Sequence, residues 1–458
     1  MGLLAGIGQR FLDFCDRFGG HFRRRTRTVE ASARHYVRGL LQAEPKNMER
    51  MEEAIPDADH QALQHMLSES AWSERAVLDQ VAEDANRLLG GYADSSLLID
   101  ESGCPKKGSH SVGVARQWCG QLGKVENCQV GVFAALSRGT GVTLIDGRLF
   151  LPEAWTSDPV RCQAAGIPVA QRGFQRKTDL ALAMIRHARQ QGIGFAWVGF
   201  DGFYGSDPAF LRALAAQGEI FVGDVHKDQR IYLADPQPTV PPAQTTHGRP
   251  PTRRQAQTPA VRVDHWAQQQ PATAWQPVTL RDGTKGALRV EILHQRVWLW
   301  DGEEAQARPW HLLVRREIDD PTEIKYSLSN APADTPVPRL AFMQGQRYWI
   351  ERALQQGKQD VGLGDYQVRG WRGWHHHMTL VMMAMLFGLE ERRLHQQPRP
   401  LLSGTDIRAL LNHFLPRRDT TLAEVLRQME VRHRKRQAAI DSAYRKQQLN
   451  STLSDLSV

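Results

Sequence analysis

The sequence is poor in cysteine and contains no long apolar run. Five cysteines among 458 residues are a small and odd number, which argues against a disulfide framework. Three of them, Cys104, Cys119 and Cys128, lack the paired spacing of a zinc site. No stretch of 18 consecutive apolar residues occurs, and this excludes a membrane-spanning helix. We therefore expect reduced thiols and no membrane partner.

The first residues carry no recognisable targeting signal. The segment MGLLAGIGQRFLDFCDRF is too short and too charged for a secretory signal. Gly6 stands where an N-myristoylation signal requires Ser or Thr. These features predict a cytoplasmic location.

Positive charge, in contrast, is in excess. The chain has 58 Lys and Arg against 50 Asp and Glu, a net charge of +8. Residues 21–27 read HFRRRTR, and residues 432–436 read RHRKR. A single charge run is most often a solvated face, but two runs at opposite ends of a basic chain favour a polyanionic partner such as nucleic acid.

Hydrophobic patterning changes several times along the chain. Residues 1 to about 90 have the periodicity of amphipathic helices, with Ser70 or Ser73 as a candidate cap. The strand-like runs SSLLID, CQVGVFAAL and GVTLIDGRLFL then precede alternating helices and strands that end at IFVGDV. This order predicts a mixed α/β sheet. Nine prolines in residues 235–277 indicate a long loop, and three antiparallel strands are predicted after it.

Several acidic residues follow strand-like runs. Chemistry on phosphodiesters commonly uses two divalent metal ions about 4 Å apart, held by converging carboxylates. Asp100 follows SSLLI and Asp201 follows FAWVGF, so both are candidates, although each could equally cap a helix or form a turn. Asp224 ends another such run and remains a rival. Asp146 is interpreted as part of a DG hairpin turn.

The stretch RYWIERALQQGK, residues 347–358, places three charged residues in one sector of a helix. Arg347, Glu351 and Lys358 are spaced by four and seven residues, which puts them within a narrow angular range. An amphipathic surface helix has much the same pattern, so this window alone does not distinguish solvent from a bound anion.

Three blocks in fixed order resemble those of a DDE-type insertion-sequence transposase. They read IDESGCPKKGSHSVGVARQWCGQLGKVENCQVGVF, WVGFDGFYGSD and RYWIERALQQGKQDVGLGDYQVRGWRGWHHHMTL. The resemblance covers roughly residues 30–390 and implies a ribonuclease H-like fold with a β-rich insertion. It also implies that Asp100, Asp201 and Glu351 are the catalytic, metal-binding acids. They would hold two divalent ions, Mg²⁺ with Mn²⁺ as a substitute.

The same branch of the family carries a Tyr-x2-Arg-x3-Glu-x6-Lys signature around its third acid. Arg347, Glu351 and Lys358 match it, whereas Gln344 occupies the tyrosine position, and whether Tyr348 replaces that phenol is open. Arg347 would grip a DNA phosphate in bidentate fashion and Lys358 would act as a point charge beside it.

Two further groups of residues have open or structural interpretations. Lys106 and Lys107 follow the first acid, and phosphate contact and plain solvation are equally compatible with their position. The adjacent His375, His376 and His377 would point in different directions on a helix, so we expect a structural or DNA-contacting role for them, and no metal site.

The resemblance implies a transposase that binds terminal inverted repeats, cleaves element ends by metal-activated hydrolysis and joins the 3′-hydroxyl ends to target DNA. The partner would be double-stranded DNA, with a homodimer assembled on it, at the nucleoid of a prokaryote. Two alternatives remain open: a domesticated or inactive DNA-binding protein, and a stand-alone DNA nuclease on the same fold.

The predicted architecture has five parts. A mixed α/β, ribonuclease H-like core is interrupted by a β-rich insertion and flanked by helical terminal regions. The predicted ranges are a DNA-binding N-terminal region (1–90), the first part of the core (91–226), the insertion with its Pro-rich loop (227–335), the second part of the core with the Glu helix (336–390), and a basic C-terminal region (391–458).

Overall fold

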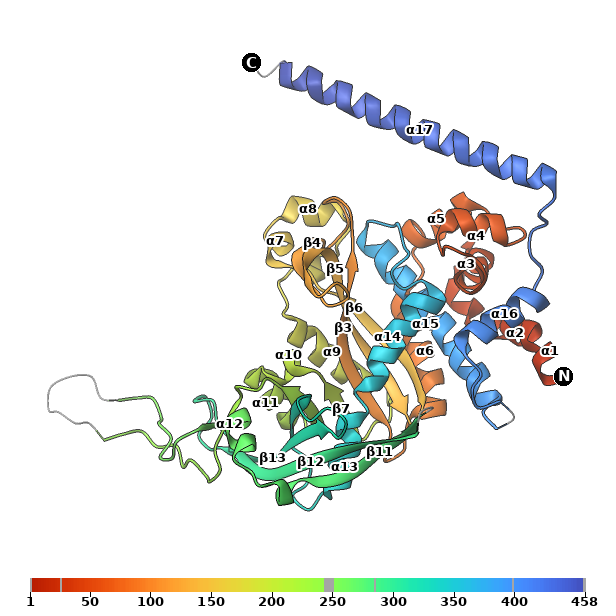
Figure 1. Ribbon diagram of the computed structural model, residues 1–458. Coiled ribbons are helices and arrows are strands. Elements are labelled where there is room, and N and C mark those ends of the chain that lie inside the picture. The colour runs from red at the N-terminus through yellow and green to blue at the C-terminus, as the bar shows by residue number, and fades with distance from the viewer. Residues whose placement is uncertain (1, 25–26, 243–250, 284–285, 398, 456–458) are drawn as a thin grey trace.

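The central feature of the structure, a computed structural model, is one large mixed β-sheet (Figure 1). The structure describes residues 2–24, 27–242, 251–283, 286–397 and 399–455. Five strands form the core of the sheet in the order β6-β5-β3-β7-β8, with β3, β7 and β8 parallel and β5 and β6 antiparallel. Helices flank this sheet, which confirms the predicted ribonuclease H-like α/β core. The bounds are β3 (Ser96–Pro105), β5 (Lys124–Arg138), β6 (Gly141–Leu149), β7 (Trp197–Phe200) and β8 (Phe221–Val225), with β4 (Ala115–Cys119) paired to the start of β5.

The β-rich insertion extends this same sheet. Its strand β14 (Ile324–Ser329) pairs antiparallel with β8, and β13, β12 and β11 follow outward in that order. Ser327 of β14 lies opposite Asp224 of β8. The insertion is therefore hydrogen-bonded directly to the core strand that carries a candidate acid. The outer strands are β11 (Gln276–Gly283), β12 (Gly286–Leu299) and β13 (Arg308–Glu317).

The predicted loop over residues 235–277 is partly wrong. Helix α12 (Val263–Gln268) lies within it and buries Val263 and Trp266 in a small hydrophobic core with the insertion strands. Short pieces β10 (Val261–Arg262) and η3 (Ala272–Ala274) flank that helix, and β10 pairs with β9 (Arg230–Ile231). The segment VRVDHWA, whose apolar residues Val263, Trp266 and Ala267 are buried, stands between the prolines that suggested a loop. Residues 243–250 lie outside the described part of the chain.

Asp146 lies within strand β6, so its assignment to a hairpin turn is wrong. The register of β6 against β5 shifts next to Asp146, between Ala134 and Ala135. The carboxylate is buried, accepts the Gly147 backbone N–H at 2.8 Å and pairs with Arg75 at 2.7 Å. Asp146 thus pairs with a half-buried arginine beside the sheet and has no part in a turn.

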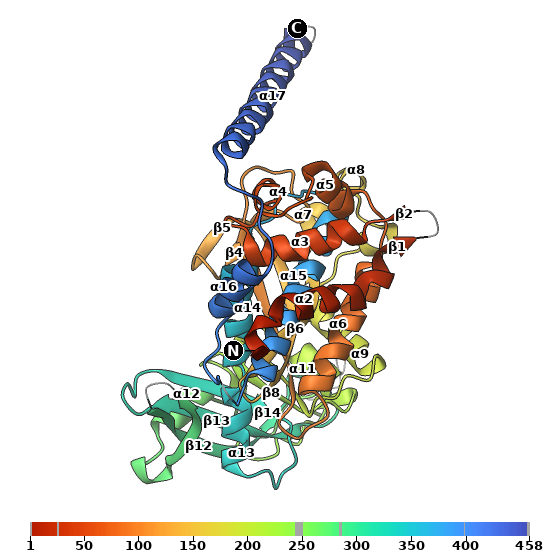
Figure 2. The same cartoon turned by 90° about the vertical axis from the view of Figure 1, so that its right-hand side faces the viewer.

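The N-terminal helices share one hydrophobic core with the sheet and with helix α15 (Trp371–Leu394) (Figure 2). Phe11 packs edge-on against Phe387 of α15, with ring centroids 5.3 Å apart. Ser73 caps α6 by accepting the Ala76 N–H, as the sequence suggested. The helices are α1 (Gly2–Ala5), α2 (Ile7–Phe18), α3 (Glu30–Gln42), α4 (Met48–Ala54), α5 (His60–Ser68) and α6 (Glu74–Leu89), with η1 (Gly19–Phe22) and the strands β1 (Arg23–Arg24) and β2 (Arg27–Thr28) after α2.

Helix α15 is apolar on nearly every side because it is buried between the sheet and the N-terminal helices. Its residues 376–387 are all buried. Such an all-round apolar helix belongs either to a protein core or to a membrane. Within the described residues, no helix is long and apolar enough to cross a membrane. The remaining helices are α7 (Glu153–Thr156), α8 (Pro159–Ala164), η2 (Val169–Gln171), α9 (Lys177–Gln190), α10 (Gly202–Gly205), α11 (Pro208–Ala216), α13 (Val337–Gly345), α14 (Tyr348–Val361), α16 (Gly404–Phe414) and α17 (Leu422–Asp455).

The three adjacent histidines at the start of α15 have packing roles. His376 stacks on Trp72 with ring centroids 3.8 Å apart, and its Nδ1 lies 2.9 Å from the Leu67 carbonyl oxygen. His377 Nδ1 lies 2.8 Å from the Tyr36 hydroxyl, and its Nε2 lies 3.1 Å from the Gly362 carbonyl oxygen. Burial lowers the pKa of His376 to about 4 and that of His377 to about 3. Both rings are therefore neutral in the folded protein.

These buried rings predict a loss of stability on mild acidification. The unfolded chain protonates each histidine near pH 6.5, whereas the folded protein does so only below about pH 4. The stabilisation is therefore fully present above pH 6.5 and is lost as the pH falls from 6.5 towards 4. We expect the free energy of unfolding to fall by about 1.4 kcal/mol per pH unit for each histidine in this window. Chemical denaturation at a series of pH values measures the slope.

A matched pair of variants isolates the contribution of these two residues. The double variant His376→Gln, His377→Gln should show a clearly flatter slope, even if its stability at neutral pH is lower. The variant His433→Gln, on the exposed face of α17, should keep the wild-type slope. An unchanged slope in the double variant would contradict the assignment of neutral, buried rings.

Candidate active site

Three acids lie at the same level on three adjacent parallel strands. In the register of β3 with β7, Ile99 is opposite Phe200, and in that of β7 with β8, Phe200 is opposite Gly223. The next residues along the three strands are Asp100, Asp201 and Asp224. Strand β3 itself continues to Pro105 against β5, so only its parallel pairing ends before Asp100. Ligands of open α/β sheets bind at this carboxyl edge.

Asp201 both caps a helix and faces the site. Its Oδ1 accepts the backbone N–H groups of Phe203 at 3.1 Å and Tyr204 at 3.4 Å, which opens the short helix α10. Gly205 at the end of α10 lies against β8, because a Cβ there would be 1.9 Å from the Asp224 carbonyl oxygen. The GFYG sequence thus brings the chain after Asp201 back beside Asp224.

Arg347 joins the acids of the sheet to Glu351 of helix α14. It is the N-cap residue of α14, one turn before Glu351. Its Nε lies 3.0 Å from Asp224 Oδ2, and its terminal nitrogens lie 2.6 Å from Glu351 Oε1 and 3.9 Å from Asp100 Oδ2. One guanidinium therefore contacts carboxylates from β3, β8 and α14.

Asp224 is anchored from the insertion. The Ser327 hydroxyl donates to Asp224 Oδ1 at 2.6 Å, and Gln344 Nε2 donates to Ser327 Oγ at 2.6 Å. Gln344, at the signature's tyrosine position, is buried beneath the site. Tyr348 packs under Arg281, whose guanidinium carbon is 3.7 Å from the ring centroid. Neither residue lines the main cavity, so the structure gives no support for Tyr348 as the missing phenol.

The half-buried carboxylates of Asp100 and Asp201 repel one another. Burial raises the pKa of Asp100 to about 7, and the nearby charge of Asp201 adds to this shift while Arg347 opposes it. Burial also raises the pKa of Asp201, against the opposing effects of Arg347 and two backbone N–H groups. Burial lowers the pKa of Arg347, but the surrounding carboxylates, Asp224 first, outweigh it and raise that pKa overall. A bound positive charge is strongly favoured at this position.

A large open cavity of about 1630 Å³ contains all the predicted acids. Asp100, Asp201, Asp224 and Glu351 lie on its wall together with Arg347. Cationic side chains also line the cavity, namely Lys227, Lys325 and Lys358, together with Arg262, which is paired with Asp264. A cavity lined by both acidic groups and lysines suits a polyanion that carries a reactive phosphate.

The predicted phosphate contacts differ in their positions. Lys358 lines the cavity, whereas Lys106 Nζ lies 3.4 Å from the centre of the Tyr366 ring and donates to the Tyr366 carbonyl at 3.1 Å. Lys106 is thus held in a structural contact, and Lys107 is exposed on the following turn. Glu101, which the sequence analysis did not single out, also lines the cavity but is neutralised by Lys177 at 2.7 Å.

The donor set suits hard divalent cations. Asp100 and Asp201 supply carboxylate oxygens side by side, and their mutual repulsion would be relieved by such an ion. Among the described residues, no three Asp, Glu, His or Cys side chains form a group that could hold a metal ion. In this arrangement the Glu351 side chain is 48% exposed and its carboxylate is bound to Arg347. A rotation of that side chain would be needed for it to join the two aspartates.

Comparison with known proteins identifies the family. Residues 17–287, more than half of the chain, match the sequence model described as DDE superfamily endonuclease. The chain belongs to this superfamily, whose nucleases use divalent metal ions. The match contains Asp100, Asp201 and Asp224 and ends before Glu351, so it leaves the third acid to be inferred from the structure.

Individual relatives are more distant. The chain is 22% identical over 345 residues to a probable transposase for insertion sequence element IS701 from Microchaete diplosiphon, covering 75% of this chain and 77% of the relative. The NurA nuclease from Sulfolobus solfataricus aligns with 70% of this chain and 92% of its own length at 10% identity, with a TM-score of 0.24.

The contacts of Asp224 predict that it positions Arg347 and is not itself a metal ligand. Asp224→Asn keeps the size of the side chain but removes its negative charge. We expect DNA cleavage to slow by about 10- to 100-fold, because the guanidinium loses its strongest anchor and a shift of about 1 Å is costly. Single-turnover cleavage rates measured across a Mg²⁺ titration test this.

The metal titration separates the two roles. If Asp224 positions Arg347, the Mg²⁺ concentration for half-maximal rate stays at the wild-type value, and Ser327→Ala gives a smaller loss of the same kind. A large increase in the required Mg²⁺ concentration would instead make Asp224 a metal ligand and the true rival of Asp201.

Proposed function

We propose that this DDE superfamily endonuclease is the transposase of an insertion sequence that cleaves the ends of its element and joins the 3′-hydroxyl ends to target DNA. The observation that carries the proposal is the convergence of Asp100, Asp201, Arg347, Glu351 and Lys358 on one cavity. The 22% identity to a probable IS701 transposase, over three quarters of the chain, favours transposition over a stand-alone nuclease.

Asp100, Asp201 and Glu351 are the residues proposed to hold two Mg²⁺ ions, with Mn²⁺ as a substitute. When bound, such ions lower the pKa of water and stabilise negative charge at phosphorus. Both reactions are in-line displacements of one oxygen by another at phosphorus, first by water at the end of the element and then by the freed DNA 3′-hydroxyl at a phosphodiester of the target. One set of residues therefore serves both.

Arg347 and Lys358 are proposed to place the scissile phosphate. Arg347 keeps its Nε–H bond to Asp224 and turns its two terminal nitrogens from Glu351 to the phosphate oxygens. Its planar, forked donors fix the orientation of the phosphate, and Lys358 adds charge without direction. Support comes from the 3.0 Å contact with Asp224, which holds one edge of the guanidinium.

DNA recognition is proposed to involve the rest of the chain. The helical region of residues 1–90 is the candidate for the terminal inverted repeats, and two copies are expected to assemble on paired ends, at the nucleoid of the cell. Lys107 remains a candidate phosphate contact. The run RRRTR lies partly outside the described residues. Because the N-terminal helices share their core with the sheet, the full chain is the appropriate sample for binding experiments.

Removal of any one of the three acids should abolish chemistry and spare binding. Asp100→Asn, Asp201→Asn and Glu351→Gln each remove a proposed metal ligand, whereas DNA affinity comes mainly from basic groups. We expect no cleavage of a labelled element end with Mg²⁺, and end-binding affinity equal to or slightly above that of the wild type.

The matched control is Asp228→Asn, which alters an exposed carboxylate on the wall of the same cavity. This variant should cleave at the wild-type rate. If Glu351→Gln cleaves normally, Glu351 of α14 is not a catalytic residue. If the wild-type protein cleaves but never produces strand-transfer product, the alternative of a stand-alone nuclease is favoured.

The variant Arg347→Lys should distinguish the positioning of the scissile phosphate by Arg347 from the effect of its positive charge alone. The variant keeps the positive charge but loses the forked donors, so we expect normal end binding and cleavage slower by on the order of 100-fold. Arg262→Lys, on the wall of the same cavity and paired with Asp264 of its own segment, serves as the control and should cleave normally. Equal single-turnover rates for Arg347→Lys and the wild type would reduce Arg347 to a structural ion pair.

A further inference from the structure

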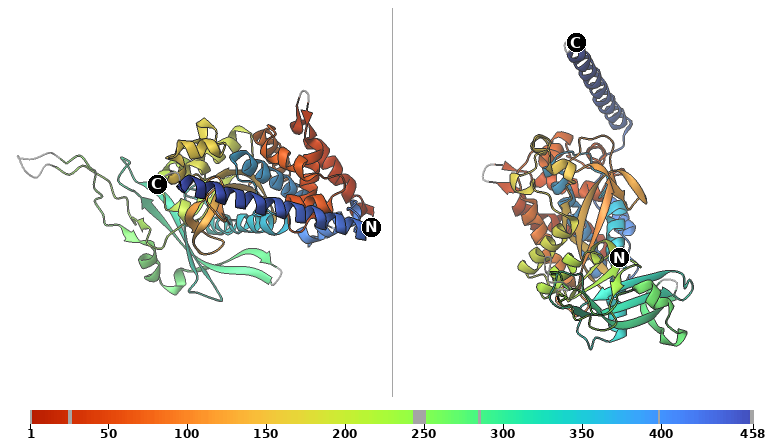
Figure 3. Two further views of the ribbon diagram at one scale, coloured as in Figure 1. Left: turned by 90° about the horizontal axis from the view of Figure 1, so that it is seen from above. Right: turned by 90° about the vertical axis from the view of Figure 1, so that its left-hand side faces the viewer.

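The C-terminal helix α17 contacts the rest of the protein mainly through polar side chains. It spans 34 residues, and beyond its first turns it projects away from the body of the molecule (Figures 2 and 3). Its described side chains are exposed or half-buried, and none is fully buried. The half-buried ones, Glu424, Gln428, Val431, Arg432 and Lys435, follow one stripe of the helix. A helix held by a hydrophobic face would have an apolar stripe at these positions.

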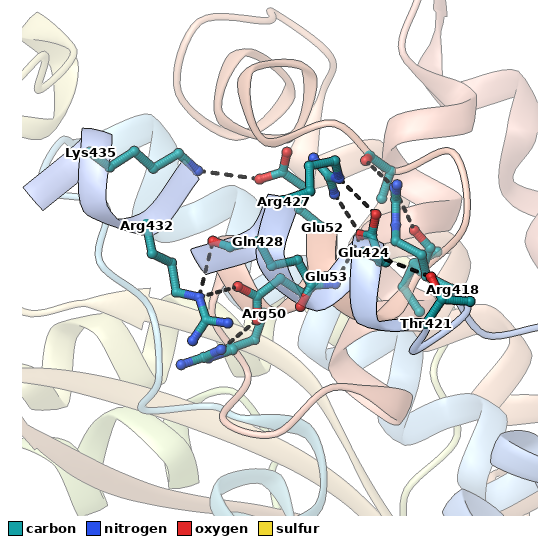
Figure 4. A network of polar contacts seen from close by, with 12 residues as sticks. Arg50, Glu52, Glu53, Arg418, Thr421, Glu424, Arg427, Gln428, Arg432 and Lys435 are labelled. Atoms are coloured by element: carbon teal, nitrogen blue, oxygen red, sulfur yellow. Dashed lines mark hydrogen bonds and ion pairs between the residues drawn. The ribbon is translucent and has the colours of Figure 1, made fainter. Parts of the chain in front are cut away.

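Carboxylates of helix α4 hold this stripe (Figure 4). Arg432 Nε lies 3.0 Å from Glu53 Oε1, and Lys435 Nζ lies 3.2 Å from Glu52 Oε2. Glu53 is also bound by Arg50 of its own helix. These ion pairs are partly exposed to solvent, where such contacts contribute little and weaken with salt. Other charged groups can therefore replace the carboxylates of α4 as partners of α17 at little cost.

The segment before α17 is fixed more firmly. The Arg418 backbone N–H donates to the Ala54 carbonyl at 3.0 Å, and its guanidinium donates to the carbonyls of Ile55 and Ala58. Thr421 Oγ1 then accepts the Glu424 N–H at the start of the helix. The root of α17 thus stays in place if the ion pairs further along open.

The basic run in the middle of α17 has more cations than the body neutralises. Arg434 and Arg436 lie on either side of Lys435 and are exposed, and neither has an ion pair with a described carboxylate. The run RHRKR therefore has four positive side chains. Arg432 and Lys435 pair with carboxylates of α4, and Arg434 and Arg436 face solvent.

We propose that α17 is a DNA-binding arm whose resting position is held by Glu52 and Glu53 in the place of DNA phosphates. DNA would release Arg432 and Lys435 from α4 and bind them together with Arg434 and Arg436. The proposal rests on the proposed function for its ligand, double-stranded DNA, and adds a site outside the catalytic cavity.

A second copy of α17 fits this surface less well than DNA. The exposed apolar residues Leu422, Leu426, Met429, Ile440 and Tyr444 follow a three-four spacing, as in a coiled coil. His433 and Arg436 occupy the middle positions of that stripe, so a helix pair would have to bury them in its seam. A phosphate backbone, in contrast, pairs with the charge of this region.

Binding of a random-sequence duplex, in EDTA so that no cleavage occurs, is the first test. In the full chain, Arg432→Gln with Lys435→Gln should weaken binding and reduce the slope of log affinity against log salt concentration by about 2, because two phosphate contacts are lost. Glu52→Gln with Glu53→Gln should strengthen binding severalfold, since the competitor is removed. Glu153→Gln with Asp334→Asn makes the same charge change at two distant exposed carboxylates and should have little effect.

The position of α17 can be measured directly because all five native cysteines are buried. Nitroxide labels at Ala438→Cys on α17 and Gln61→Cys on α5 report the distance between arm and body by pulsed electron resonance. We expect a defined short distance in the free protein, and a longer or broader distribution with the duplex or in the Glu52→Gln, Glu53→Gln background.

The outcomes distinguish this proposal from failure of the proposed function. If the Arg432→Gln, Lys435→Gln variant binds the duplex with wild-type affinity and salt dependence, α17 is not a DNA-binding arm, whether or not the protein cleaves DNA. A change in oligomeric mass with no change in DNA affinity would overturn it in favour of a second copy. If α17 binds DNA as expected but the protein never cleaves element ends, the DNA-binding arm is supported and the catalytic proposal is refuted.

Discussion

The parallel pairing of β3, β7 and β8 is the constraint on which the rest of the site depends. Its register places Asp100, Asp201 and Asp224 at one level, although they are spread over more than 120 residues of sequence. Buried carboxylates this close are unfavourable unless a cation lies among them, and Arg347 supplies one. The position of helix α14, and with it Glu351 and Lys358, is tied to the sheet through this guanidinium.

The insertion contacts the proposed active site at the carboxylate that holds the same arginine. Strand β14 continues the catalytic sheet, so Ser327 faces Asp224 across one strand pair and fixes the carboxylate that holds Arg347. Gln344 in turn donates a hydrogen bond to Ser327 from the buried side. Gln344, at the tyrosine position of the signature, thus has a structural contact of its own in this protein. The insertion and the core therefore form one structural unit around the site.

The sequence predicted most of the core because its strands and helices have clear local patterns. WVGF is fully buried as a strand, and KTDLALAMIRHARQ forms a helix whose apolar residues face the core. The signature also placed Arg347, Glu351 and Lys358 on one face of a helix. What local pattern could not give was long-range partnership: the anchoring of Asp224 by Ser327, the pairing of Asp146 with Arg75, the contact of Lys106 with Tyr366, and the helix α12 hidden among prolines. Each depends on segments brought together only by the fold.

The central claim is that acids from three separate segments hold metal ions at one point. Iron(II)-dependent cleavage of the polypeptide tests it most directly: Fe²⁺ replaces Mg²⁺, and added hydrogen peroxide and ascorbate generate radicals that cut the chain beside the bound ion. The account predicts cuts near Asp100, Asp201 and Glu351 that excess Mg²⁺ suppresses and that Asp100→Asn abolishes at all three places. Cuts near Asp224 without any near Glu351, or near His375–His377, would contradict it.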